Sequence, residues 1–231
     1  MKNKVVSDAQ WLKAREQLLA KEKQFTRLRD KLSEARRAIP WKAVTKEYLF
    51  DGPKGKLSLS DLFDGRSQLV IYHFMFAPEW DKGCPHCSFW ADNFNPNVIH
   101  LNHHDVTLAA VSRAPYKKVA AYKKSMSWTF SWVSSGNSDF NYDFHVSFTP
   151  QEVAKKKAFY NFKVQDPFMS DREGVSVFTK DAKGRIFHTY STYARGIDLV
   201  NTAYNFLDMT PKGRNEAQGN QYWIKRHNEY K

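Results

Sequence analysis

The stretch QLVIYHFMFAPEWDKGCPHC, residues 68–87, joins an almost continuous apolar run to a pair of cysteines. The run, residues 68–76, has the length and composition of a central strand that is buried on both faces of a sheet. Cys84 and Cys87 follow a short loop and stand where the next helix is expected to begin. The sequence therefore predicts a strand–loop–helix unit with a C-x-x-C motif at its helical end.

The same alternation of strands and helices continues downstream. Residues 106–111 predict a second buried strand, 115–126 a helix, and 130–133 a short strand. Strand–helix–strand units build parallel sheets through right-handed crossovers. Two hairpins, over residues 48–59 and 175–190, add antiparallel strands. The fold class is therefore α/β, with a mixed central sheet in a three-layer α/β/α sandwich.

Further helical segments surround this sheet. Residues 88–104 predict a helix that is interrupted at Pro96, and residues 196–209 predict a final amphipathic helix. Residues 136–172 are polar, aromatic and irregular, apart from a helix expected at 150–157.

The first forty residues have a different pattern. Ser7 and Gln10 have the spacing of a capping box, which marks the start of a helix, and Pro40 marks its end. Between them an apolar residue recurs at every seventh position: Trp11, Leu18, Phe25, Leu32 and Ile39. A long helical arm over residues 7–39 follows, which either lies across the domain or pairs with a second copy of the chain.

The chain thus divides into an arm at 1–40, a domain at 41–210, and a tail at 211–231 that is expected to pack on the domain. Its 231 residues are 42% hydrophobic and 15% aromatic, which excludes a wholly disordered chain. The mean hydropathy is −0.65, and no apolar run approaches the roughly 18 residues of a membrane span. The N-terminus lacks the apolar core of a secretory signal, so the expected location is cytoplasmic, without a membrane partner.

The net charge is +12, and residues 1–47 carry 13 basic and 6 acidic residues, which is +7 of that total. A basic chain can bind nucleic acid, but charge on one solvated helix face is weak evidence for it. A nucleic-acid partner is therefore not expected.

The two cysteines carry the predicted chemistry. Helix N-termini offer free amides and a partial positive charge, which favour a thiolate at Cys84. Cys87, three residues on, would then close a small disulfide. Pro85 fixes the helix start, and His86 can supply positive charge or an N–H to the Cys84 thiolate. These features predict a nucleophile, a resolving cysteine and a disulfide more oxidising than that of a general reductant.

Other uses of the cysteines remain open. They could be a structural pair, or zinc ligands completed by histidines at 86, 100, 103 and 104. A zinc site would take the cysteines away from dithiol chemistry, so neither a metal nor a cofactor is expected.

Three residues are candidates for the rim of the site. Ser112 and Arg113 follow the strand at 106–111, and carboxyl ends of parallel strands share one edge of a sheet. Trp80 precedes Cys84 in the loop. Arg113 could stabilise a thiolate or bind an anion, or form a surface salt bridge.

With these motifs the chain resembles the thioredoxin-like superfamily, in its alkyl hydroperoxide reductase and thiol-specific antioxidant branch. More closely, it resembles a bacterial thioredoxin-like family known as a domain of unknown function. The stretches that carry the likeness are 83–92, 105–108, 111–115, 132–135, 139–144 and 190–196. The resemblance implies a thioredoxin-like fold over almost the whole chain.

The chain departs from that superfamily at two places. Counted from Pro78, the peroxiredoxin pattern places its hydroxyl at Lys82 and its cysteine at Pro85. Thioredoxins carry a cis-proline before the last hairpin, where this chain has Glu173-Gly174-Val175. The first departure removes the peroxide-activating arrangement, and the second removes a group that positions a substrate cysteine.

The sequence therefore predicts a thiol–disulfide oxidoreductase, acting on a thiol or disulfide with a separate reductant. Two alternatives remain. One is a thiol peroxidase that reduces hydroperoxides through Cys84. The other is a non-enzymatic thioredoxin-fold module that binds a partner, or a second copy, through its basic helix at 7–39.

Overall fold

The computed structural model describes residues 3–217, 219 and 221–231, and the chain divides into two compact units, residues 1–40 and 41–231. The first unit is a single helix, α1 (Asp8–Ala38). The Ser7 hydroxyl accepts a hydrogen bond from the Gln10 amide at 3.4 Å, and Gln10 Oε1 accepts from the Ser7 amide at 3.2 Å. The predicted capping box is therefore confirmed. The helix ends where Ile39 becomes extended ahead of Pro40.

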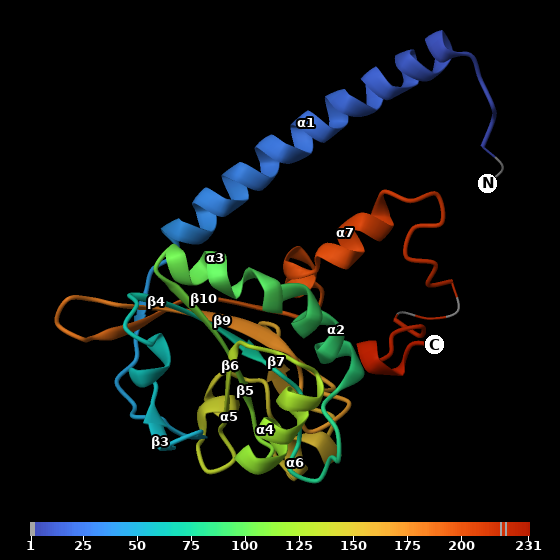
Figure 1. The fold of residues 1–231 in the computed structure, drawn as a ribbon. Helices are drawn as coiled ribbons and strands as arrows, with labels where there is room; N and C mark the ends of the chain where they lie inside the picture. The colour runs from blue at the N-terminus through green and yellow to red at the C-terminus, as the bar shows by residue number, and fades with distance from the viewer. Residues whose placement is uncertain (1–2, 218, 220) are drawn as a thin grey trace. The chain divides into compact units, whose positions relative to one another are not determined.

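The second unit is built on an eight-stranded mixed sheet (Figure 1). In spatial order its strands are β1 (Lys42–Ala43), β10 (Ile186–Tyr193), β9 (Gly174–Lys180), β4 (Gln68–His73), β5 (Val106–Ser112), β6 (Ser131–Ser134), β2 (Leu49–Gly52) and β3 (Gly55–Ser58). Strands β4, β5 and β6 are parallel, whereas β9 is antiparallel to β4 and β10 to β9. The order β10–β9–β4–β5 is that of a thioredoxin-like core, so the predicted fold class is confirmed.

Helices cover both faces of the sheet. One face carries α2 (Pro85–Phe94), η2 (Asn95–Asn97), α3 (Val98–His103), α4 (Tyr116–Ser125), η3 (Ala194–Val200) and α7 (Thr202–Asp208). The other carries η1 (Asp61–Phe63) and α5 (Phe140–Asp143). The connection from β6 to β9 also holds α6 (Pro150–Ala154) and a separate hairpin of β7 (Ala158–Tyr160) and β8 (Lys163–Gln165), and η4 (His227–Glu229) lies in the tail.

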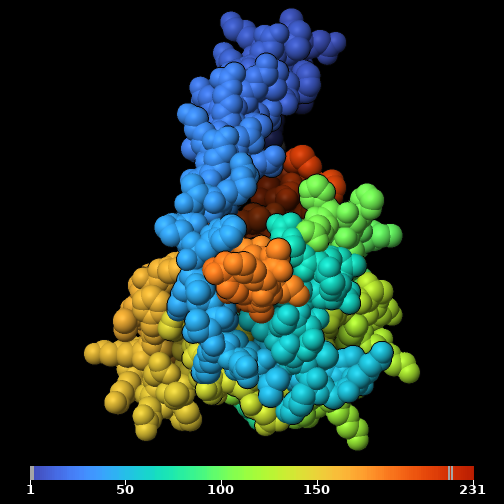
Figure 2. Space-filling view, turned by 90° about the vertical axis from the view of Figure 1, so that its left-hand side faces the viewer, coloured from blue at the N-terminus to red at the C-terminus, as the bar shows by residue number. Residues whose placement is uncertain are grey.

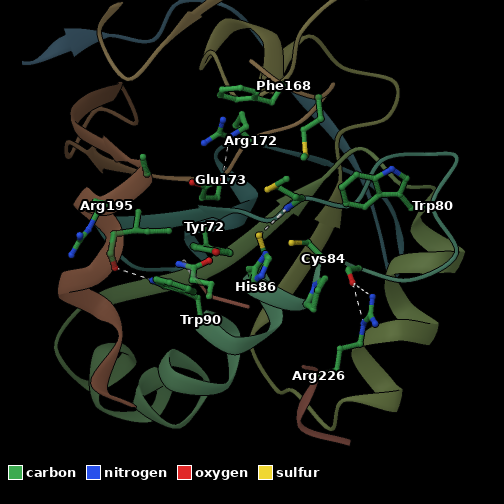
Figure 3. A pocket seen from close by; sticks show the side chains of 18 of the residues that line it. Tyr72, Trp80, Cys84, His86, Trp90, Phe168, Arg172, Glu173, Arg195 and Arg226 are labelled. Atoms are coloured by element: carbon green, nitrogen blue, oxygen red, sulfur yellow. Dashed lines mark hydrogen bonds and ion pairs between the residues drawn. The ribbon is translucent and has the colours of Figure 1, made fainter. Parts of the chain in front are cut away.

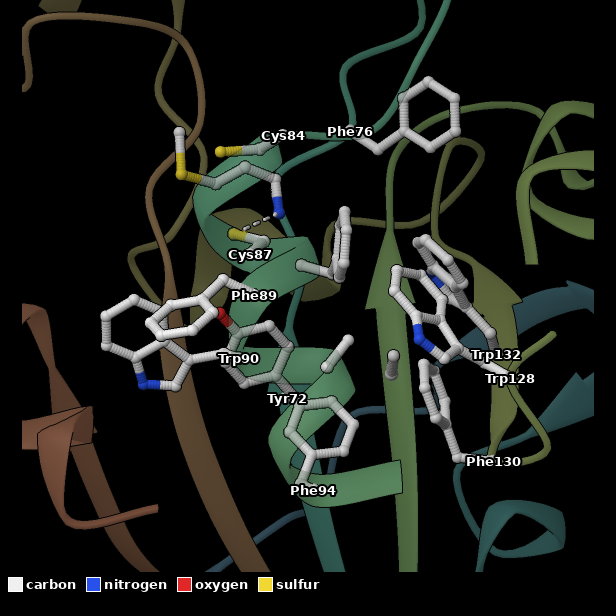
Figure 4. Packing of buried hydrophobic residues seen from close by; sticks show 14 of the residues in the cluster. Tyr72, Phe76, Cys84, Cys87, Phe89, Trp90, Phe94, Trp128, Phe130 and Trp132 are labelled. Carbon is white, nitrogen blue, oxygen red and sulfur yellow. Dashed lines mark hydrogen bonds between the residues drawn. The ribbon is translucent and has the colours of Figure 1, made fainter. Parts of the chain in front are cut away.

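Strand β4 supplies both layers of the core because its side chains alternate between the two faces. Leu69 and Ile71 point to the layer under η1, while Tyr72 and the following Phe74 point to the layer under α2. The second layer is rich in aromatic rings (Figure 4). The ring centroids of Phe74 and Trp132, for example, are 4.4 Å apart. This packing fixes α2 against the sheet, and so fixes the cysteines at its start.

The apolar run that begins at residue 68 leaves the sheet earlier than predicted. Strand β4 ends at His73, and after it the Phe74 amide still bonds to the Val111 carbonyl at 3.0 Å. The Met75 carbonyl then accepts from the Cys84 amide at 3.1 Å. The chain turns out of the sheet here because its backbone pairs with the start of α2.

Two other segments differ from the expectation. The helix predicted at 196–209 is two helices, because Asn201 stops η3 and its side chain caps α7 through the Tyr204 amide at 3.0 Å. The β7–β8 hairpin lies within residues 136–172, which were expected to be irregular because no alternation of apolar and polar residues was recognised there. The helix predicted at 150–157 ends at Ala154.

One contact in the second unit joins the end of β9 to the segment that follows β3. The turn between β9 and β10, orange in Figure 2, reaches the surface beside the segment around residues 50–65, drawn in cyan. Lys180 and Ser60 meet there at 3.4 Å. Among the residues that the structure describes, no helix is long and apolar enough to cross a membrane.

Candidate functional site

Cys84 is the N-cap of α2, directly behind the loop that follows β4. Pro85 occupies the first turn of the helix, where a missing amide costs nothing. The Ser88 amide closes that turn on the Cys84 carbonyl at 3.0 Å. Cys87 lies one turn on, and its sulfur accepts a hydrogen bond from the Met75 amide at 3.5 Å. The predicted helix start at Cys84 is therefore present.

The groups around the two cysteines shift the pKa values of their thiols in opposite directions. A hydrogen bond from the Cys87 thiol to Cys84 Sγ is the main reason why the pKa of Cys84 lies well below its usual value. A hydrogen bond from the His86 imidazole lowers this pKa further. These groups outweigh burial, which acts in the other direction. The bond to Cys84 in turn raises the pKa of His86. Burial raises the pKa of Cys87 well above its usual value, and the Cys84 thiolate beside it raises it further. Of the two sulfurs, Cys84 is therefore the one that loses its proton more readily.

Both sulfurs lie at the floor of a cavity of about 770 Å³. Cys84 is only 7% exposed and Cys87 2%. The walls come from four separate stretches: the loop 80–83, residues 168–173, residues 194–198, and the tail residues Gln221 and Arg226. Figure 3 shows Cys84 and His86 in the middle of these walls, with Trp80 on one side and Glu173 and Tyr72 on the other.

Arg226 of the tail holds the turn at Gly83, directly before Cys84. The Arg226 guanidinium donates to the Gly83 carbonyl at 2.7 and 3.1 Å and to the Tyr122 hydroxyl at 2.9 Å. Position 83 is restricted to glycine, since a Cβ there would lie 2.7 Å from the Tyr122 ring and 2.8 Å from the Phe74 ring. A hydrogen bond between His86 and the Gln221 backbone further raises the pKa of His86. The tail therefore helps to orient both the Gly83 backbone and the His86 side chain, which lie on either side of Cys84.

Tyr72 is a buried polar group that faces the cysteines. Its hydroxyl has no nitrogen or oxygen partner among the described residues, and it interacts with the sulfur of Cys87. Burial raises the pKa of Tyr72 well above its usual value, so the phenol stays protonated. It can therefore donate a hydrogen bond to a Cys87 thiolate whenever one forms.

Glu173 stands where thioredoxins have their cis-proline, and the described residues contain no cis peptide bond. Its carbonyl accepts a hydrogen bond from the Tyr160 hydroxyl at 2.8 Å, and its carboxylate lies 3.5 Å from the Arg172 guanidinium. Arg172 also stacks over the Tyr160 ring, 4.7 Å from its centroid. This segment is therefore held by the loop that carries β7.

The predicted rim is only partly assembled. Trp80 lines the cavity, but Ser112 and Arg113 do not. The Ser112 hydroxyl is buried, where it donates to the Phe74 carbonyl at 2.7 Å and accepts from the Trp132 indole at 3.0 Å. Arg113 pairs with buried Asp171 at 2.7 Å. Ser112 is the last residue of β5 and Arg113 follows it, but their side chains bind Phe74, Trp132 and Asp171, so their placement on the rim beside Cys84 was wrong.

The histidines considered as zinc ligands do not gather at the cysteines. His86 lies beside Cys84, while His100 and His103 are on α3 and His104 follows that helix. Within residues 3–217, 219 and 221–231, no three His, Cys, Asp or Glu side chains are placed to share a metal ion.

The sequence reasoning missed four contributors to the site. Tyr72 had a signal, since it is one of two polar side chains in the otherwise apolar run at 69–76. Glu173 had a weaker one, as the residue that stands in the cis-proline position. Gln221 and Arg226 had none, because a tail more than 130 residues away meets Cys84 only through tertiary packing.

A model of one protein family, described as "Bacterial protein of unknown function (DUF899)", matches residues 1–230. No curated protein matches the sequence.

Solved structures are more distantly similar. Peroxidoxin BcpB from Mycobacterium tuberculosis has 14% identity and a TM-score of 0.47, covering 71% of this chain and 94% of its own. The bacterioferritin comigratory protein of Xanthomonas campestris has 15% identity and a TM-score of 0.47, covering 73% and 96%. A DsbE thiol:disulfide interchange protein from Chlorobium tepidum, described as putative in its title, has 10% identity and a TM-score of 0.43, covering 72% and 98%.

Proposed function

Because this chain belongs to the DUF899 family of bacterial proteins, whose description names no reaction, we propose its function from the site itself: it is a thiol–disulfide oxidoreductase. Cys84 is the nucleophile and Cys87 the resolving cysteine. One observation carries the proposal. Two sulfurs one helical turn apart have pKa values displaced in opposite directions, which is the division of roles that a dithiol exchange requires.

The reaction proceeds in two displacements. The Cys84 thiolate attacks one sulfur of a disulfide, the sulfur–sulfur bond of the substrate breaks, and one thiolate leaves. Cys87 then loses its proton and attacks Cys84 Sγ, which forms the Cys84–Cys87 disulfide and releases the second thiolate. The substrate gains two electrons and the protein loses two. A separate dithiol reductant then restores the reduced protein.

A redox titration tests this proposal. In glutathione buffers, Cys84 and Cys87 are expected to form one disulfide with a midpoint above about −200 mV, because the stabilised Cys84 thiolate favours the reduced form. In His86→Ala the midpoint should fall and the thiolate absorbance should titrate at higher pH.

A midpoint below about −270 mV, as found in general reductants, would contradict the expected oxidising potential but not disulfide exchange itself. Rapid oxidation by hydrogen peroxide without any reaction toward disulfides would contradict the proposed function and assign peroxidase chemistry instead.

Removal of the Tyr72 hydroxyl is expected to slow the second displacement alone. In Tyr72→Phe the Cys87 thiolate loses a buried donor, and a hydrogen bond to a charged group contributes about 1.5–3 kcal/mol, or roughly 10- to 100-fold in rate. Stopped-flow detection of the two released thiols separates the two steps.

Tyr222→Phe is the matched control, since Tyr222 is half exposed in the tail and does not line the cavity. Equal second-step rates in Tyr72→Phe and the unsubstituted protein would remove Tyr72 from the mechanism.

A further inference from the structure

We propose that this site acts on low-molecular-weight disulfides and not on the disulfides of folded proteins. The inference rests on the proposed function and names its substrate class. Three features of the cavity carry it: access to the nucleophile, the state of the neighbouring backbone, and the chemistry of the walls.

Cys84 presents little surface to solvent. It lines a cavity to which four other stretches of the chain contribute, and only 7% of the residue is exposed. A cystine in a folded protein is attached on both sides to backbone, which would have to approach this cavity together with the disulfide. A small disulfide brings no such bulk.

Part of the backbone of residues 170–173, two of which line the cavity, is already paired within the chain. A protein substrate commonly binds by adding an extended segment to a free backbone edge. Here residues 146–148 run alongside 170–172, with the Phe148 amide on the Ser170 carbonyl at 2.9 Å and the Arg172 amide on the Val146 carbonyl at 2.8 Å. The Ser147–Asp171 bridge and the Tyr160 bond to the Glu173 carbonyl complete this contact. These backbone groups are therefore not free to pair with a peptide.

The walls suit a compact molecule with short carbon arms. Met75, Trp80, Phe168 and Met169 present aromatic and thioether surface around the entrance to Cys84. Arg172 lies over the Phe168 ring, 6.0 Å from its centroid. The charged side chains that line the cavity are the basic Lys82, Arg172, Arg195 and Arg226 and the acidic Glu173 and Asp198. A volume of about 770 Å³ lies within the roughly 300–1,000 Å³ typical of small-molecule sites.

A single-turnover comparison on the reduced full chain tests the substrate class. The probes are hydroxyethyl disulfide, glutathione disulfide and insulin, each measured by loss of the Cys84 thiolate absorbance. Each rate is divided by the rate of dithiothreitol with the same disulfide, which removes differences in intrinsic reactivity. The small disulfides are expected to give normalised rates at least tenfold above that of insulin.

A pair of variants connects this preference to the cavity. Phe168→Ala removes part of the entrance wall and is expected to slow the small disulfides about fivefold, while alkylation of Cys84 by iodoacetamide stays unchanged. Phe162→Ala is the matched control, because Phe162 is an exposed aromatic residue of the same loop that does not line the cavity.

The outcomes separate the two proposals. A normalised insulin rate equal to those of the small disulfides would overturn the substrate class and leave the oxidoreductase function standing. No reaction with any of the three disulfides would overturn the function. Equal rates in Phe168→Ala and Phe162→Ala would show that the cavity entrance does not select the substrate, which contradicts the inference.

Discussion

Replacement of Cys84 by serine is expected to lower the rate of disulfide exchange about 1,000-fold or more, whereas replacement of Cys87 by serine stops the reaction after its first step. A serine hydroxyl is not ionised near neutral pH, so the nucleophile is lost. Cys87 cannot take its place, because burial holds the pKa of Cys87 high and the sulfur is only 2% exposed.

Each variant is the control for the other, because each replaces one sulfur by oxygen and the two positions are one helical turn apart. With hydroxyethyl disulfide, Cys87→Ser should form a mixed disulfide on Cys84, which adds the mass of one mercaptoethanol less two hydrogen atoms, and release one thiol per chain. Cys84→Ser should form no such adduct. Either of two results would show that Cys84 is not the nucleophile: a Cys84→Ser protein that keeps a tenth of the original rate, or an adduct found on Cys87.

Acid is expected to destabilise the protein through His73. This side chain is buried in the sheet, where its Nε2 pairs with Ser176 Oγ at 2.8 Å. The Ser176 hydroxyl meets Ser191 at 2.8 Å, and Ser191 meets His188 at 2.7 Å. Burial, assisted by the charge of His188, lowers the pKa of His73 to about 3.

The sign of the pH effect follows from this displacement. In the unfolded chain a histidine binds its proton near pH 6.5, while folded His73 stays neutral until about pH 3. The stabilisation is thus fully present above pH 6.5 and is lost as the pH falls toward 3. The free energy of unfolding should decrease by about 1.4 kcal/mol for each pH unit between 6 and 4 from this group alone.

Urea unfolding at a series of pH values measures this slope. In His73→Gln the slope should be shallower by about 1.4 kcal/mol per pH unit, whatever the stability of the variant at pH 7. His103→Gln is the control, because His103 lies exposed on α3 and its loss should leave the slope unchanged. Identical slopes in His73→Gln and the original protein would show that His73 is protonated in the folded state.

Much of the fold was predictable because its signals are local. The apolar runs that form β4 and β5 differ from everything around them, and two buried runs joined through a helix imply a parallel pair. The capping box of Ser7 and Gln10 marked the start of α1 to the residue. Cys84 at the start of α2 followed from its place between a strand and a helix.

The errors arose where partners distant in the sequence decide the outcome. Ser112 and Arg113 were assigned to the rim from strand direction alone, but hydrogen bonds to Phe74 and Asp171 draw them elsewhere. Local periodicity contains no information about such partners. The break in the helix expected at 196–209 has a local cause instead, because the Asn201 side-chain oxygen accepts from the Tyr204 amide and caps α7.

The class of fold and the place of the two cysteines at a helix start can be predicted from the amino-acid sequence, because strand burial and helix capping depend on residues close together in the chain. The depth at which Cys84 lies and the groups that surround it depend instead on tertiary packing. The tail through Arg226, the Glu173 segment and the Tyr72 hydroxyl reach the cysteines from positions that are remote along the chain. Their contacts form when the layers pack, and it is this packing that determines the acidity of each sulfur and the access to it.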